Sequence, residues 1–177
     1  MRNAKLFAAI AALTLAAVTA AAIVPARARW RTATADELRR VIPARAPVIK
    51  ENIETEFRTA SGVIDNRGRF IAGVVMITAG YSAEGKYSHF FLTQAPLRVG
   101  ELELAAGQYV FGYTRASDDS IRVSFYRAAT GEAVGDVEAR RGTRKGGGVR
   151  SLLINPPAAG RANIQIGRFL LEYRVTD

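Results

Sequence analysis

The chain has 177 residues, no cysteine and a single histidine, which excludes disulfides, thiolate metal sites and cysteine nucleophiles. Its formal charge of +9 comes from 25 lysines and arginines against 16 aspartates and glutamates, and a basic surface attracts polyanions. Arginine outnumbers lysine by 21 to 4, a bias that a GC-rich coding sequence also produces. Composition therefore permits an anionic partner without establishing one.

The first 28 residues have the layout of a secretory signal peptide. Arg2 and Lys5 precede an uncharged run over 6–24, Pro25 ends any helix, and Ala26-Arg27-Ala28 offers small residues at the two positions that a signal peptidase reads. The run is rich in alanine, which buries little apolar area, so we expect cleavage rather than a retained membrane anchor. The predicted location is the periplasm or the extracellular space, with a charge of +6 after cleavage.

Residues 29–61 are predicted to form an N-terminal arm. Thr34 and Glu37 have the spacing of a capping box, which starts a short helix that Pro43 stops. In 47–60, apolar residues recur at four-residue spacing, as in a helix, but β-branched residues in the same stretch equally fit an extended edge strand. Both alternatives stay open for this segment.

From residue 62 to 177 the pattern is that of short strands separated by turns. Asp65-Asn66-Arg67-Gly68 and Ala129-Thr130-Gly131-Glu132 are two such turns. The spacing predicts an all-β domain: an antiparallel β-sandwich of eight or nine strands, with a small barrel as the second choice. The predicted organisation is a signal peptide (1–28), the arm (29–61) and the sandwich (62–177).

Two local motifs carry a resemblance to a known group of proteins. Leu102-Glu103-Leu104-Ala105-Ala106-Gly107-Gln108-Tyr109 matches the pattern Leu-x-Leu-x-x-Gly-x-Tyr, and 125–131 reads Phe-Tyr-x-Ala-Ala-Thr-Gly. With these motifs the chain resembles an uncharacterised group of small exported bacterial β-sandwich proteins. The resemblance implies a turn at the glycine, a strand opened by the tyrosine, and an envelope setting. It implies no activity.

Candidates for catalysis are few. His89 lies in an aromatic segment, and we interpret it as a partly buried, hydrogen-bonded strand residue, because a single histidine builds neither a metal site nor a triad unaided. No serine lies in a Gly-x-Ser-x-Gly turn. Asp118 and Asp119 fit a turn better than a calcium loop. We therefore predict a protein that is not an enzyme and that uses no metal or cofactor.

The sharpest local signal is a basic loop. Five cations occur in the eleven residues 140–150, on a backbone that contains three consecutive glycines. The loop predicts an anion-binding site formed by Arg140, Arg141, Arg144, Lys145 and Arg150. The alternative is a solvated hairpin tip whose charges keep strand edges from pairing with other molecules.

A second candidate surface is aromatic. Tyr109 and Tyr113 alternate along one predicted strand and share a face. If exposed, they would form a stacking platform for a carbohydrate; if buried, they belong to the core.

The leading prediction is thus an exported, non-catalytic binding or structural protein. Its expected partner is an anionic polysaccharide, a lipid headgroup or another envelope protein, and nucleic acid is not an expected partner of an exported chain. The alternatives are a carbohydrate-binding module and a self-associating subunit of a strand-paired assembly. Membrane anchoring requires that the signal peptide is retained.

Overall fold

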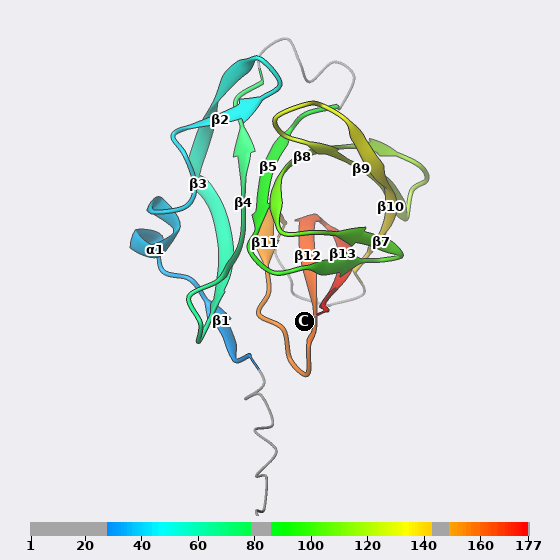
Figure 1. Cartoon of the computed structure of the whole chain (residues 1–177). Helices are drawn as coiled ribbons and strands as arrows, with labels where there is room; N and C mark the ends of the chain where they lie inside the picture. The colour runs from blue at the N-terminus through cyan, green and yellow to red at the C-terminus, as the bar shows by residue number, and fades with distance from the viewer. Residues whose placement is uncertain (1–27, 79–85, 143–148, 177) are drawn as a thin grey trace, which may run out of the picture.

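The computed structural model describes residues 28–78, 86–142 and 149–176. The predicted signal peptide, apart from Ala28, lies outside this part of the chain. In the described residues one short helix accompanies thirteen strands, which form one large antiparallel sheet (Figure 1). The elements are β1 (Trp30–Thr32), α1 (Ala35–Arg39), β2 (Arg45–Val48), β3 (Glu51–Asp65), β4 (Phe70–Met76), β5 (His89–Thr93), β6 (Leu97–Val99), β7 (Leu102–Leu104), β8 (Gly107–Arg115), β9 (Ser120–Arg127), β10 (Ala133–Arg141), β11 (Arg150–Ile154), β12 (Arg161–Gly167) and β13 (Phe169–Val175).

The sheet curls until its far end meets its beginning (Figure 1). The strand order is β1-β3-β4-β5-β8-β9-β10-β13-β12-β11. The last strand, β11, packs against β3, where the backbone N–H of Ile154 donates to Ser61 Oγ at 2.8 Å. The all-β prediction is confirmed, but a sandwich of eight or nine strands is not: the structure has a single curled sheet, because successive strands continue to pair around the curve instead of dividing into two layers.

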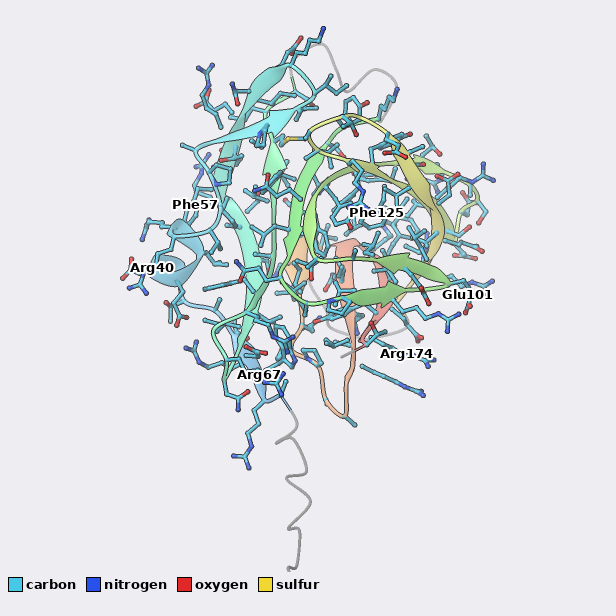
Figure 2. All side chains as sticks on the ribbon, in the orientation of Figure 1. Arg40, Phe57, Arg67, Glu101, Phe125 and Arg174 are labelled. Carbon is cyan, nitrogen blue, oxygen red and sulfur yellow. The ribbon has the colours of Figure 1, made fainter. Side chains whose placement is uncertain are left out.

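One hydrophobic core fills the inside of this curl. Side chains that alternate along the strands point inward, among them Phe91 of β5, Phe111 of β8 and Phe125 of β9. The Phe125 ring lies 5.2 Å from that of Phe111 and 6.1 Å from that of Phe91, centroid to centroid. Figure 2 shows Phe125 inside the curl, with charged side chains outside it.

A second core lies on the outer face of β3, β4, β5 and β8. There the intervening side chains, such as Phe90 and Val110, are fully buried beneath the N-terminal segment 33–48. Because β5 is covered on both faces, all five of its residues are buried. The N-terminal segment is therefore a layer of the fold rather than a free arm.

The structure decides two predictions for the N-terminal segment, the capping box and the conformation of residues 47–60. The capping box is present: Thr34 Oγ1 accepts from the Glu37 N–H at 3.3 Å, and a Glu37 carboxylate oxygen accepts from the Thr34 N–H at 2.8 Å. The open question over 47–60 is resolved in favour of strands, since β3 begins at Glu51 and runs for 15 residues. The expected arm boundary at residue 61 falls inside this strand.

The motif at 102–109 connects two strands, but the connection lies at Ala105 and Ala106, and the glycine, not the tyrosine, begins the second strand. β7 ends at Leu104 and β8 begins at Gly107. The Tyr109 hydroxyl donates to the carbonyl of Ala105 at 2.7 Å, a backward bond of the kind that tyrosine corners make in β-proteins. The same ring is fully buried in the inner core.

Candidate functional site

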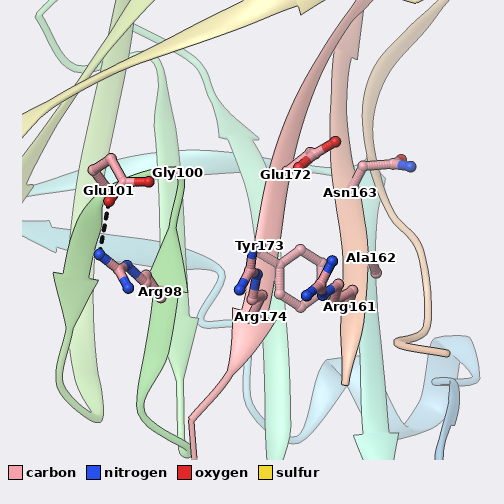
Figure 3. Close-up of a pocket in the computed structure, with 9 residues that line it drawn as sticks. All are labelled: Arg98, Gly100, Glu101, Arg161, Ala162, Asn163, Glu172, Tyr173 and Arg174. Carbon is pink, nitrogen blue, oxygen red and sulfur yellow. Dashed lines mark hydrogen bonds and ion pairs between the residues drawn. The ribbon is translucent and has the colours of Figure 1, made fainter. Parts of the chain in front are cut away.

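Three arginines stand directly opposite one another across neighbouring strands. In the pairing of β6 with β13, Arg98 is opposite Arg174; in the pairing of β12 with β13, Arg174 is opposite Arg161. Cross-strand partners share a face of the sheet and lie one strand spacing, about 4.8 Å, apart along the backbone. Figure 3 shows the three side chains as one line on the outer face. We call Arg98, Arg174 and Arg161 the arginine row.

The hairpin of β6 and β7 places one end of the row. Gly100 takes a positive φ of 56° at the turn, and its N–H donates to the carbonyl of Glu172 at 2.9 Å, which fixes the hairpin on β13. Arg98 Nη2 donates to the Glu101 carboxylate at 2.7 Å, and Glu103 is the cross-strand partner of Arg98 on β7. This end of the row is therefore neutralised in part.

The other two arginines have no such partner. Arg161 and Arg174 are exposed, and within the described ranges neither side chain forms an ion pair or a hydrogen bond. Like charges directly opposite each other in a sheet are destabilising. The repulsion between these two guanidinium groups therefore lowers the stability of the fold, and a bound anion would offset it.

A shallow cavity of about 340 Å³ follows the row. Its wall continues along β13 and β12 to Glu172 and Asn163, which form the neighbouring line of side chains in Figure 3. Glu172 faces away from the arginines in this view. Chemically, each guanidinium of the row offers several N–H donors in one plane, an arrangement suited to carboxylate, sulfate or phosphate oxygens.

The predicted basic loop is only partly within the described chain. Arg144 and Lys145 lie outside it. Arg140 and Arg141 belong to the end of β10: Arg140 lies 3.5 Å from the Glu138 carboxylate, and Arg141 lies 3.2 Å from that of Asp119 and donates to the Asp118 carbonyl at 2.8 Å. These two guanidinium groups therefore already have anionic partners.

Arg150 lies at the same end of the sheet but apart from those two. It opens β11 opposite Gly167, whereas Arg141 is opposite Phe169 on β13. Three strand spacings, about 14 Å, separate Arg141 from Arg150 along the sheet. The described residues of the loop therefore do not converge on one point.

The predicted aromatic platform of Tyr109 and Tyr113 is not present as a pair of exposed rings. Tyr109 is fully buried, and Arg127 covers it, with the guanidinium 5.2 Å from the ring centroid. Tyr113, on the same strand, is 41% exposed. The strand therefore offers a single exposed tyrosine ring and not a pair, because the curl of the sheet takes Tyr109 into the inner core.

His89 is a hydrogen-bonded strand residue, as expected, but it is buried in the core rather than partly buried. Its ring stacks on Phe111 at 4.6 Å, and its Nδ1 lies 2.8 Å from Ser88 Oγ. Burial lowers the pKa of His89 to about 4, against a smaller opposing contribution from the backbone of Ser151. His89 lines none of the concavities around the arginines, so it contributes nothing to the site.

Neither metal sites nor membrane-spanning helices are found where the structure is described. No cluster of three or more metal-ligating side chains occurs between residues 28 and 176, outside the gaps at 79–85 and 143–148. In the same ranges no helix has the length and apolar character needed to cross a bilayer.

Sequence reasoning missed the arginine row. Each of its members is an outward-facing residue in an ordinary alternating strand, and up to 76 positions separate them in the chain. Only the register of β6, β13 and β12 brings them together. The excess of arginine was the one signal in the sequence, and composition does not indicate which arginines lie together in the structure.

Comparisons with protein-family models, curated proteins and solved structures give no match for this chain.

Proposed function

We propose that this chain is an exported, non-catalytic protein that binds an anionic polymer through the arginine row. The observation that carries the proposal is the direct opposition of Arg98, Arg174 and Arg161, two of which have no carboxylate partner in the described chain. The signal-like layout of the first 28 residues supports export.

A linear ligand fits this geometry better than a small anion. The three guanidinium groups come from consecutive strands, so their backbone anchors span about 10 Å in a line. The row lies along a shallow cavity rather than in an enclosed pocket. A polymer with regularly spaced acidic groups satisfies several arginines at once, and linked contacts of this kind raise the overall affinity.

The row is a better assignment than the end of β10. Arg140 and Arg141 each lie within ion-pair distance of a carboxylate, and an anion binding there would have to displace that carboxylate. At Arg161 and Arg174 it displaces only water. Because both ion pairs are exposed, the difference in favour of the row is at most about 1 kcal/mol per pair.

The test is retention on immobilised polyglutamate and on immobilised polygalacturonate, at low salt. We expect the variant R98Q/R161Q/R174Q to bind both about tenfold or more weakly, since each exposed charge pair is worth on the order of 0.5 kcal/mol or more. Binding by the wild type should also weaken steeply as salt is added.

The matched control is R40Q/R45Q/R122Q. It removes three exposed arginines from α1's end, β2 and β9, so the change in net charge is the same. We expect this variant to bind nearly as the wild type does. Equal losses in the two variants would contradict the proposal, because binding would then follow net charge alone.

A further inference from the structure

A second concavity begins where the arginine row ends. It has a volume of about 340 Å³, and Arg161 and Arg174 line it together with Trp30. Pro157, Ala159, Gly160 and Val175 complete its wall, and Ala28, the last residue of the predicted signal peptide, borders it in the uncleaved chain. No carboxylate borders it among the described residues. The two arginines without ion pairs therefore have an indole as their neighbour on this side, in place of the glutamates on the other.

Trp30 is held firmly in this position. It lies in β1 opposite Asp65 of β3, and one part of its side chain packs on the inner core. The guanidinium of Arg69 lies 5.8 Å from the ring centroid, and it is fixed in turn by the Asp65 carboxylate at 2.8 Å. Asp65 is buried and also accepts the backbone N–H groups of Arg67 and Arg69, so several hydrogen bonds hold the Arg69 guanidinium beside the ring.

We infer that the polymer is an acidic polysaccharide, and that one of its sugar rings stacks on Trp30 while neighbouring acid groups pair with Arg161 and Arg174. This inference rests on the proposed function and adds the chemical class of the ligand. An aromatic ring beside guanidinium groups matches a ligand that alternates apolar ring faces with carboxylates. A polyanion without rings has nothing to place on the indole.

A lipid surface fits the same place less well. Binding to a bilayer buries apolar side chains around the basic residues. The large hydrophobic residues exposed in the described chain are Ile49, Ile77, Tyr113 and Val149, and none of them lines either concavity. The proposal therefore commits to a polysaccharide, and vesicles become an arm of the test.

The experiment uses the fluorescence of Trp30, which is the only tryptophan in the chain. We expect polygalacturonate to shift its emission saturably and to protect it from an added quencher. Polyglutamate should bind through the arginines with little effect on the emission, and dextran, which is neutral, should not bind. R161Q/R174Q should shift the response to about tenfold higher concentrations of polygalacturonate.

A variant separates stacking from charge. W30L should weaken binding to polygalacturonate about five- to tenfold and leave binding to polyglutamate unchanged, whereas W30F, which keeps a ring, should restore most of the loss. Thermal unfolding shows whether each variant is folded. If a variant does not fold, the fluorescence titration of the wild type still tests the inference.

The outcomes are distinct. If W30L binds polygalacturonate as well as the wild type does and the emission does not respond, the inference is overturned while the proposed function stands. If R161Q/R174Q retains all binding, the proposed function fails first. Preferential binding to phosphatidylglycerol vesicles over polygalacturonate would replace the polysaccharide with a lipid.

Discussion

Two regions of this molecule concentrate arginine, and they differ in what surrounds the charge. At the end of β10, Arg140 and Arg141 each have a carboxylate within 3.5 Å. In the arginine row, Arg174 stands between two other arginines and has no ion-pair partner in the described chain. The first arrangement is that of a solvated strand end. The second leaves positive charge free for a ligand.

The difference shows that the number of cations in a segment is a poor guide to anion binding. The segment 140–150 is denser in positive charge than any strand of the row. Yet the free energy of binding depends in part on whether a cation already has a partner, since breaking an exposed ion pair costs up to about 1 kcal/mol. Register between strands decides that question for Arg141 and for the arginine row, whereas Arg140 has its partner two residues away on its own strand.

The largest effect is expected where an arginine has a buried partner. D65N replaces a carboxylate that is fully buried and bound to Arg69, so the new amide N–H₂ would meet guanidinium donors. We expect a loss of about 3 kcal/mol in the free energy of unfolding, measured with urea. The matched change D119N removes the exposed partner of Arg141, and it should cost less than about 0.5 kcal/mol.

The dependence of stability on pH provides a second test of the role of Asp65. Burial opposes ionisation, but hydrogen bonds from the backbone and side chain of Arg69 and the backbone of Arg67 prevail and lower the pKa of Asp65. The stabilisation is therefore present above the unfolded-state pKa, near 4, and is lost as pH falls below it. Equal unfolding energies for wild type and D65N at pH 7 would contradict a structural role for this pair.

The second-largest effect is a change of stability with pH that arises from His89 and not from the arginines. His89 is neutral in the folded chain, with a pKa of about 4, whereas in the unfolded chain it gains a proton near pH 6.5. Its contribution is complete above that pH and is lost as pH falls toward 4. We expect the free energy of unfolding to drop by about 2 kcal/mol between pH 7 and pH 5, as measured by urea denaturation.

The arginines stay charged throughout that range. Binding of the folded protein to polyglutamate or polygalacturonate should therefore not weaken through loss of charge on the arginine row. The variant H89F, which keeps a flat ring against Phe111, should remove most of the pH dependence of stability. If its stability falls with acid as steeply as that of the wild type, the dependence arises elsewhere.

Parts of this structure follow from the sequence alone. The β-rich pattern, the turn at 65–68 and the capping box of Thr34 and Glu37 are local features, and each is present. The curl is not local: it depends on β11 returning to β3, a contact between Ile154 and Ser61 across 93 residues. The arginine row depends on the same kind of information, which no pattern of neighbouring residues contains.

A third prediction compares the two arginine regions directly. R161Q/R174Q should weaken retention on polygalacturonate about tenfold, the equivalent of about 1.4 kcal/mol. R140Q/R141Q removes the same charge from the end of β10, and its effect should stay within about twofold, since these side chains are already paired. The reverse order of effects would assign binding to the basic segment 140–150 instead.

The smallest expected effect is on the free energy of unfolding, and it shows whether the charges of the arginine row destabilise the fold. In R174T, threonine suits a strand, and the substitution removes the like-charge repulsion between Arg174 and its two cross-strand neighbours, Arg98 and Arg161. We expect the free energy of unfolding to rise by about 0.5 kcal/mol at low salt, and the gain to shrink at high salt, where the repulsion is screened.

The matched control for that change is R122T. Arg122 is also exposed in a strand with a neighbour on each side, but these neighbours are Glu138 and Thr114, so its loss removes an attraction and should destabilise slightly. A gain for R174T beside a loss for R122T, with weaker retention of R174T alone, means that the fold tolerates repulsion for the sake of a ligand. Destabilisation by R174T at both salt concentrations would mean instead that Arg174 supports the sheet through its packing.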